Sequence, residues 1–320
     1  MPWLPHSLEA LEADAADAGV ALEIVAVDNG SDDGSLDLLH VRENVQLVCN
    51  PVNVGFALAV AQGTALARAP WLLLINADAI VQPGFFAAMG KATQNAPSDA
   101  ASFVPDTRFM SEPSRVNHRG LTVDEIGLPH ERAAGLTPDQ ADREPSPLLG
   151  GSGGAVLLHA AALDRIGGFE PAYFAYFEDV DVAWRLQRAG FSAQFVPDAV
   201  TWHAGSGSSG VDSPVKAYLV GRNRLLLTMR HGAVARPGQR FMIEAAHGIV
   251  QALFARHIWG IRGRVGAVGR VRYARFLRAV DRDLGLVEAK EVPRAPAPPL
   301  LATLTRKLRV TRAMRAADKG

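Results

Sequence analysis

The sequence has little cysteine, and this excludes two kinds of structure. Cys49 is the single cysteine among 320 residues. An internal disulfide needs two cysteines and a cysteine-built metal site needs more, so the chain can form neither within itself. One thiol without a disulfide framework fits a reducing compartment, and we expect a cytoplasmic protein.

Long apolar runs and a net charge are also missing. No uninterrupted hydrophobic stretch approaches the roughly 20 residues that a membrane-spanning helix needs. The first residues, Met1 to His6, lack the basic and apolar regions of a signal peptide. Lys plus Arg and Asp plus Glu both number 33, so the chain has no overall nucleic-acid signature, and we expect no nucleic-acid partner.

Basic residues gather near the C-terminus. Between Arg256 and Arg282 there are eight arginines and a single acid, Asp281. We expect a basic helical region over residues 213–290, followed by a Pro/Ala linker and a basic tail over residues 291–320. These arginines form either a solvated helix face or a surface attracted to anionic lipid headgroups.

In the first half, apolar strands end in polar turns and alternate with helices. Residues 22–27 lead into Asp28, and residues 71–75 lead into Asn76 and Asp78. Strands this apolar are typical of a parallel sheet buried on both faces. Ligands of such sheets bind at the carboxyl ends of the strands. No G-x-G-x-x-G follows these strands, which counts against a dinucleotide-binding dehydrogenase.

The middle of the chain supplies a polar excursion and a glycine-rich segment. Residues 111–147 predict a lid or substrate wall with a hairpin. The four glycines of residues 150–154 let the backbone approach a ligand closely. A strand is expected over residues 155–158 and a helix over residues 160–166.

Three carboxylates within four residues, Glu178, Asp179 and Asp181, begin a helix that ends near Gly190. Unpaired carboxylates among apolar residues cost free energy, so at least one should face a ligand, a metal or a reacting proton. The alternative is an acidic first turn favoured by the helix dipole. We expect Asp181 to pair with Arg185, and Trp184 and Phe177 to lie in the core. His118, His130 and His159 are expected on the surface.

The motifs stand in one order along the chain and together closely resemble family 2 glycosyltransferases of the GT-A fold, particularly the bacterial rhamnosyltransferase-like branch. They are DNGSDDGS at 28–35, NVGFALAVAQG at 53–63, LLLINAD at 72–78, GGSGGAVLL at 150–158, the acidic run at 167–191 and VPDAVTWH at 196–203. The resemblance implies an α/β catalytic domain over residues 1–212, with a mostly parallel central sheet flanked by helices. A C-terminal helical extension would follow.

The resemblance also implies roles for individual residues. Asp179 would be the catalytic base, with Glu178 beside it. A divalent cation, Mn²⁺ or Mg²⁺, would be held by Asp78 and His203. The donor would be bound by Asp28, Asn53, Gly55, Asn76 and Asp78.

The expected activity is inverting transfer of a sugar, rhamnose in particular, from a nucleotide-diphospho-sugar. The acceptor would be a cell-surface glycan precursor or a polyprenyl-linked sugar, reached from the cytoplasmic face of the inner membrane. The alternative is a catalytically impaired relative that still binds nucleotide-sugars.

Two features depart from the family pattern. Asn76 replaces the first Asp of the D-x-D motif, which should weaken metal binding by the protein alone. The family's buried first strand has no counterpart before residue 7. Either the true start lies upstream of Met1 or the protein lacks a central strand; we favour an upstream start, and expect poor solubility or weak activity for the chain as it stands.

Overall fold

The computed structural model describes residues 2–143, 146–204, 213–232, 242–246, 258–286 and 292–296. Residues 205–210, which are all Gly or Ser and are predicted from the sequence to form a loop, lie outside the described residues. So does most of the predicted linker and tail.

The chain alternates helices and strands through its first two thirds, and the residues described after β10 are mostly helical. The strands are β1 (Ile24–Asp28), β2 (Val45–Cys49), β3 (Trp71–Ile75), β4 (Ala79–Val81), β5 (Ala100–Phe109), β6 (Glu112–His118), β7 (Leu121–Val123), β8 (Pro129–Glu131), β9 (Ala155–His159) and β10 (Ser192–His203). The helices are α1 (Leu4–Asp17), α2 (Ser35–His40), α3 (Phe56–Leu66), α4 (Phe85–Gln94), α5 (Pro138–Arg143), α6 (Ala160–Arg165), the 3₁₀ turn η1 (Pro171–Tyr173), α7 (Glu178–Arg188), α8 (Pro214–His231), α10 (Trp259–Val268) and α11 (Val271–Asp283).

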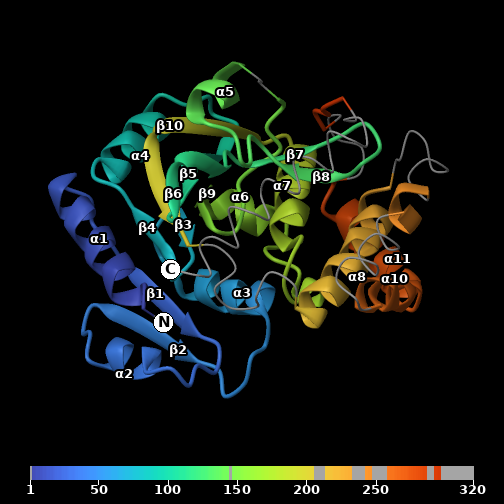
Figure 1. Ribbon diagram of the computed structural model, residues 1–320, viewed down its shortest axis with the longest axis horizontal. Helices are drawn as coiled ribbons and strands as arrows, with labels where there is room; N and C mark the ends of the chain where they lie inside the picture. Colours follow the sequence, from blue (N-terminus) through green and yellow to red (C-terminus); the bar gives the residue numbers. More distant parts are fainter. Residues whose placement is uncertain are drawn as a thin grey trace.

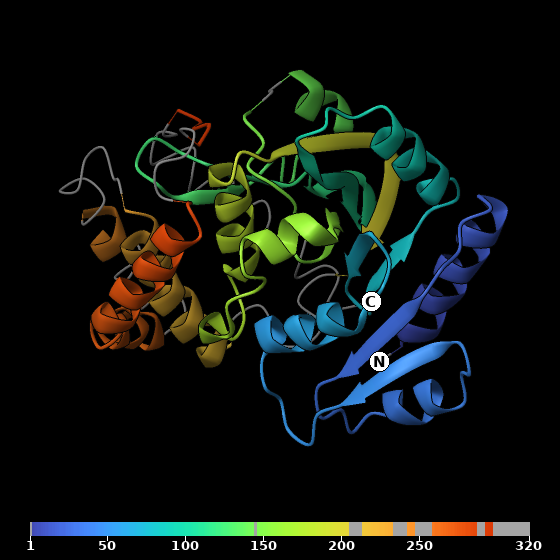
Figure 2. The same ribbon diagram turned by 180° about the vertical axis from the view of Figure 1, so that it is seen from behind.

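The elements form a central sheet with helices around it and a helical group at one end. Figures 1 and 2 show β1, β2 and α2 at one end of the molecule and α8, α10 and α11 at the other. No helix in the described ranges is long and apolar enough to cross a membrane.

The main sheet has six strands in the order β3-β9-β5-β10-β4, with β6 paired to β5. The α/β fold class is confirmed, but the sheet is more mixed than the expected mostly parallel one. The pair β5–β10 is parallel, whereas β3–β9, β5–β9, β5–β6 and β4–β10 are antiparallel. For β5–β6 the reason lies in the connection, because β5 turns directly into β6.

Strands β1 and β2 pair in parallel as a separate two-stranded sheet. The prediction that residues 22–27 and 71–75 are buried on both faces was wrong. Ile24–Val27 and every residue of β3 are only partly buried. Among the described residues no strand joins β1 to β3, so the apolar side chains of both strands lie next to an unpaired edge.

The sequence reasoning missed β5, the ten-residue strand at the centre of the main sheet. Its second half contains Pro105, Asp106, Thr107 and Arg108, which break the apolar pattern of a buried strand. Asp106 is nevertheless buried, because Arg119 donates hydrogen bonds of 3.0 and 3.1 Å to its two carboxylate oxygens. The polar residues are stabilised by partners that lie in another part of the sequence.

Helices cover both faces of the main sheet. Leu11 of α1 and Phe85 of α4 pack against Phe103 of β5 in one apolar cluster. Another cluster contains Val182 of α7 and Leu163 of α6, which pack with strands β5 and β9. The predicted hairpin of the excursion is present as β7–β8. Trp184 and Phe177 belong to the core, as expected, in a cluster shared with α8 and α11.

Candidate functional site

Asp28 lies at the carboxyl end of β1 and shapes the turn that follows it. Its side chain is buried, and its Oδ2 accepts hydrogen bonds from the backbone N–H groups of Gly30 and Ser31, both at 3.0 Å. The backbone of Asn50 binds the Asp28 carbonyl at 2.9 Å. The first predicted donor residue is therefore held in a fixed turn at a strand end.

A network of amides joins this turn to the start of α3. Asn29 Nδ2 donates to Asn53 Oδ1 at 3.2 Å, and Asn53 Oδ1 also accepts from the Gly55 N–H at 2.9 Å. The sequence also predicts Asn53 as the cap of the helix that follows it, and this was wrong in detail. Gly55 occupies the N-cap position, and Asn53 stabilises the turn before it.

Gly55 brings α3 against the segment that precedes the acidic helix. Its φ is +91°, and a Cβ there would lie 2.6 Å from the carbonyl oxygen and from a ring carbon of Phe174. The next turn is tied to the same residue, since the Ala57 N–H donates to the Phe174 carbonyl at 3.0 Å. Only glycine fits this approach, so the predicted donor residue Gly55 also has a structural role.

Asp78 and His203, the predicted metal ligands, lie together. His203 Nε2 is 3.2 Å from Asp78 Oδ1 and 3.4 Å from Asn76 Nδ2. Burial raises the pKa of Asp78, but the hydrogen bond and charge of His203 more than offset it, and the pKa lies below its ordinary value. The two side chains come from the end of β10 and from the turn after β3, which are brought together because β10 pairs with β4.

His118 lies beside this pair, and the prediction that it is a surface residue was wrong. Its side chain is 2% exposed, at the end of β6. Among the described residues its Nε2 has no hydrogen-bond partner. A Cβ on Gly154 would be 3.5 Å from that nitrogen and from His203 Cε1, so both rings face the same glycine. The sequence carries no signal for this, since His118 belongs to the polar excursion.

Asp179 lies at the start of α7 and contacts the glycine segment. Its Oδ2 accepts a hydrogen bond from the Gly153 N–H at 2.9 Å, and its Oδ1 one from Val180 N–H at 2.7 Å. Burial raises the pKa of Asp179, and these hydrogen bonds offset only part of that shift.

Glu178 is in a more hidden position than Asp179. Its side chain is 5% exposed, and its Oε2 has no partner among the described residues. Burial, with the negative charge of Asp179 second, raises the pKa of Glu178 well above its ordinary value. The geometry favours Asp179 over Glu178 as the ionised carboxylate.

Two consecutive glycines connect the acidic helix to the Asp78–His203 pair. Gly153 binds Asp179, while the carbonyl of Gly154 accepts a hydrogen bond from the Asn76 N–H at 3.0 Å. Gly154 also faces His203. The structure thus brings the predicted base and the predicted metal ligands to the two sides of one short segment.

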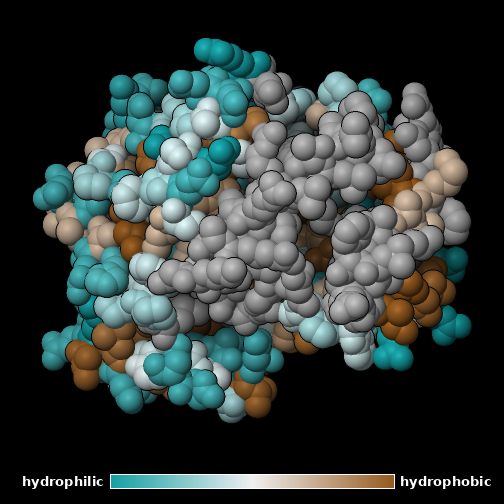
Figure 3. All heavy atoms as spheres, viewed as in Figure 1, coloured by the Kyte–Doolittle hydropathy of each residue, from teal (hydrophilic) through white to brown (hydrophobic). Residues whose placement is uncertain are grey.

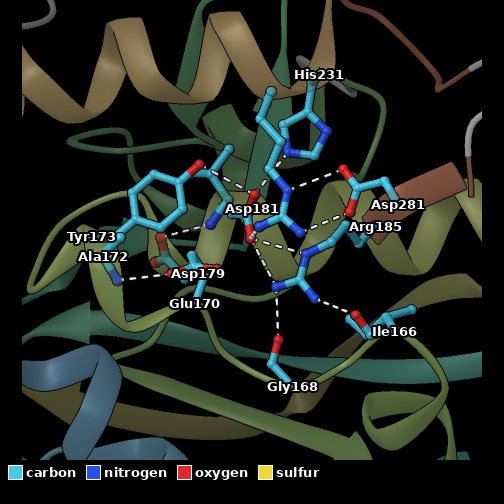
Figure 4. Close-up of polar contacts among 12 residues, drawn as sticks. Ile166, Gly168, Glu170, Ala172, Tyr173, Asp179, Asp181, Arg185, His231 and Asp281 are labelled. Carbon is cyan, nitrogen blue, oxygen red and sulfur yellow. Dashed lines mark hydrogen bonds and ion pairs between the residues drawn. The ribbon is translucent and has the colours of Figure 1, made fainter. Parts of the chain in front are cut away.

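The third acid of the run, Asp181, is fully buried and serves a different purpose. Arg185 donates to its Oδ2 through two nitrogens, at 2.9 and 2.7 Å, which confirms the predicted pairing. Figure 4 shows Tyr173, Arg185 and His231 pointing toward this carboxylate. Arg230 adds a fourth contact at 3.0 Å, and its other nitrogens bind Asp281 at 2.7 and 3.0 Å.

Helix α8 also holds the loop that carries Phe174. The Nδ2 group of Asn223 lies 2.7–2.8 Å from the carbonyls of Tyr173, Ala175 and Tyr176. Phe174, Tyr176 and Phe177 all have positive φ, which costs free energy in residues other than glycine. The sequence predicts the helix but not that Asn223 holds this loop. The only indication in the sequence is a group of polar residues next to an apolar helix face.

A family model now bears on this geometry. The model described as Glycosyl transferase family 2 matches residues 2–167, more than half of the chain. The chain belongs to glycosyl transferase family 2. It is a glycosyltransferase, although Asp179 and His203 lie beyond the range that the family model matches.

Two relatives and one solved structure are similar to this family 2 chain. N-acetylglucosaminyl-diphospho-decaprenol L-rhamnosyltransferase of Mycobacterium tuberculosis is 29% identical over 263 residues, which cover 73% of this chain and 84% of that protein. Galactofuranosyl glycosyltransferase of Leishmania donovani is 25% identical over 187 residues, 49% of this chain and 42% of that protein. A mannosyltransferase from Pyrobaculum calidifontis, solved with GDP-Man and Mn²⁺, covers 99% of this chain and 82% of its own, with a TM-score of 0.50 and 15% identity. The last likeness supports the fold alone.

Two residues of this family 2 site, Asp78 and His203, have side chains that fit the binding of a divalent cation. A carboxylate oxygen and an imidazole nitrogen lie 3.2 Å apart, and this donor set suits Mn²⁺. Within the described ranges no group of three or more His, Cys, Asp or Glu residues is placed to hold a metal. Asp78 and His203 could therefore supply two ligands of such a cation.

We expect Gly55→Ala to lower the free energy of unfolding by roughly 2–4 kcal/mol, because the methyl group meets Phe174 and the backbone conformation disfavours alanine. Chemical denaturation measures the change. The control is Gly90→Ala in α4, where nothing lies within 4 Å of the added Cβ. That variant should be as stable as the parent or gain about 0.5–1 kcal/mol. Equal effects at the two positions would contradict the close approach at Gly55.

Stability should depend on pH through His231. Burial, only partly offset by Asp181, lowers the pKa of His231 to about 4. The unfolded chain therefore takes up a proton first as the pH falls, and the free energy of unfolding decreases between about pH 6.5 and 4. From pH 6.5 to 5 the loss should be about 2 kcal/mol. His231→Gln should flatten the slope measured by denaturation at each pH, whereas His6→Gln, on a side chain 63% exposed, should not.

Proposed function

We propose that this family 2 glycosyltransferase inverts the anomeric centre as it transfers rhamnose from a nucleotide-diphospho-sugar to a lipid-linked acceptor. The observation that carries the proposal is the glycine pair at residues 153–154, which lies between Asp179 and the Asp78–His203 pair. A base on one side and cation ligands on the other suit a reaction that deprotonates a nucleophile and releases a diphosphate.

Asp179 is the proposed base. In inverting transfer, the acceptor hydroxyl attacks the anomeric carbon in one step while a carboxylate takes its proton. The raised pKa makes Asp179 more basic than an exposed aspartate. Glu178 favours its protonated form and would assist by hydrogen bonding rather than by taking the proton.

Asp78 and His203 are the proposed holders of a divalent cation, with Asn76 beside them. Such a cation would neutralise the negative charge that develops on the leaving diphosphate. Asp28, Asn53 and Gly55 would form the other end of the donor site, where their turns are joined by Asn29.

The donor and acceptor in this proposal follow the relative from Mycobacterium tuberculosis, whose name specifies rhamnosyl transfer to a diphospho-decaprenol-linked N-acetylglucosamine. The similarity extends over most of both chains, which supports the same substrate classes here. The product would enter cell-envelope polysaccharide synthesis.

A lipid-linked acceptor requires contact with a membrane, and we propose that α10 and α11 make it. Ile258, Ile261, Val265 and Val268 recur at helical spacing and are 38–67% exposed. Figure 3 shows apolar residues gathered at the lower right, where Figure 1 places these helices. Exposed apolar side chains among arginines are typical of helices that lie on an anionic membrane.

One observation favours the alternative, a nucleotide-sugar-binding relative with impaired catalysis. Strands β1 and β3, whose ends carry Asp28 and Asn76, are not joined by a strand among the described residues. A donor site split between two sheets would bind the nucleotide with less precise placement of the sugar. A chain that binds the nucleotide-sugar but neither transfers nor hydrolyses it would be such a relative.

The test of the proposed base is hydrolysis of dTDP-rhamnose by the full chain with Mn²⁺, measured as released nucleoside diphosphate. Asp179→Asn should reduce the rate at least a hundredfold with little change in donor affinity, since general-base catalysis contributes about 10²–10⁴-fold. Asp164→Asn, an exposed carboxylate on α6, is the matched control and should keep the rate. A fully active Asp179→Asn would rule out this role.

The cation site has a separate test. Asp78→Asn should raise the Mn²⁺ concentration for half-maximal hydrolysis by roughly tenfold or more, because one of two protein ligands is lost. Asp32→Asn, an exposed carboxylate in the turn after β1, should leave it unchanged. If both variants behaved alike, Asp78 would not be a ligand.

A further inference from the structure

A basic cavity lies away from the site of Asp78 and Asp179. Its volume is about 530 Å³, and its lining comes from the ends of α7 and α8 and from one face of α11. The residues that line it are Arg188, Arg230, His231, Arg275, Arg278, Asp281 and Arg282. Arg188 is the last residue of α7, so the cavity is about 15 Å from the helix start that carries Asp179.

The acids near this cavity are already neutralised. Asp281 binds two nitrogens of Arg230, and Asp181 binds both Arg185 and Arg230. Two buried carboxylates thus face two buried guanidinium groups, and their charges balance. His231 is neutral near pH 7, because burial lowers its pKa to about 4. Asp281 still attracts Arg188, but among the described residues neither carboxylate forms an ion pair with the other arginines of the lining.

Four arginines are left without a carboxylate partner among the described residues: Arg188, Arg275, Arg278 and Arg282. The three on α11 are exposed and share one helix face at spacings of three and four residues. Arg188 is partly buried and donates to the His231 carbonyl at 2.5 Å. Burial lowers the pKa of Arg188; the negative charge of Asp281 offsets part of this, and the positive charges of Arg278, Arg294 and Arg230 add to the lowering.

Helix dipoles explain only part of this arrangement. Arg188 and Arg282 lie in the last turns of α7 and α11, where a cation is favourable. Arg275 and Arg278 are in the middle of α11 and gain nothing of that kind. Four like charges around one cavity repel each other unless an anion binds between them. Guanidinium groups bind phosphate oxygens in pairs, which makes phosphate the natural anion.

We propose that the cavity between α7, α8 and α11 is a phosphate-binding site, separate from the donor site, that takes a phosphate monoester or diphosphate group. That group belongs either to a membrane lipid or to a free phosphate compound. The lipid source rests on the proposed membrane contact.

The first experiment titrates the full chain with inorganic diphosphate by calorimetry, in EDTA and 0.15 M salt. The test variant carries Arg275→Gln, Arg278→Gln and Arg282→Gln. The matched control carries Lys91→Gln, Arg143→Gln and Arg165→Gln, three exposed cations elsewhere. We expect saturable binding that is weakened at least tenfold in the test variant and kept in the control. Absent binding, or equal binding by parent and test variant, overturns the proposal.

The second experiment distinguishes the two sources by sedimentation with vesicles of matched surface charge, containing either phosphatidic acid or phosphatidylglycerol. Phosphatidic acid exposes a phosphate monoester. If the ligand is a lipid, the parent should bind vesicles with phosphatidic acid more tightly than those with phosphatidylglycerol. The test variant should bind the phosphatidic acid vesicles about a hundredfold more weakly, since each arginine near an anionic surface raises the affinity about fivefold. Equal sedimentation of parent and test variant, with diphosphate binding intact, assigns the site to a free phosphate.

Hydrolysis of dTDP-rhamnose separates this proposal from the proposed function. The test variant should hydrolyse the donor at the parent rate, because none of its changed residues contacts the donor site. An unchanged melting temperature and an unchanged rate show that the variant is folded. If the test variant lost both donor hydrolysis and diphosphate binding, the cavity would be part of the donor site, and the proposal of a separate site would be overturned. If the parent itself hydrolysed no donor, calorimetry would still decide whether the cavity binds phosphate.

Discussion

The arrangement of the structure depends on the neutralisation of one buried carboxylate. Asp181 has no exposed surface, and a lone charge there would cost several kcal/mol. Tyr173, Arg185, Arg230 and His231 all contact it, and two of them come from α8. The acidic helix can therefore be buried only when the C-terminal helices are in place. Charge balance, rather than apolar contact alone, fixes α7 relative to α8.

The same helix α8 reaches the donor side of the molecule through one loop. Asn223 holds the carbonyls of the strained segment around Phe174, and the carbonyl of Phe174 binds the first turn of α3. Gly55 permits that contact because it has no side chain. The C-terminal helices thus position both the candidate base and the entry to the candidate donor site. A helical extension that is joined in this way forms one structural unit with the α/β part of the chain.

The sequence predicted the parts of this site whose signals are local. Apolar strands followed by Asp28 and Asn76, and a glycine segment before β9, can be recognised without any partner. It did not predict β5, because the polar residues of that strand are stabilised by Arg119 from the excursion. It also missed the buried position of His118, which follows from the pairing of β6 with β5 and the approach of Gly154. Burial of a polar side chain depends on residues distant in sequence, which periodicity does not reveal.

Three neighbouring acids show why composition alone could not assign their roles. Glu178 is buried without a cation and favours its proton, Asp179 accepts two backbone N–H groups, and Asp181 is surrounded by arginines. Their different ionisation follows from what each one contacts. Because Asp181 and Asp281 are paired with Arg185 and Arg230, Arg188 and the three arginines of α11 form no ion pair with a carboxylate in the described part of the chain. The interaction that builds the candidate active site therefore also creates the basic cavity behind it.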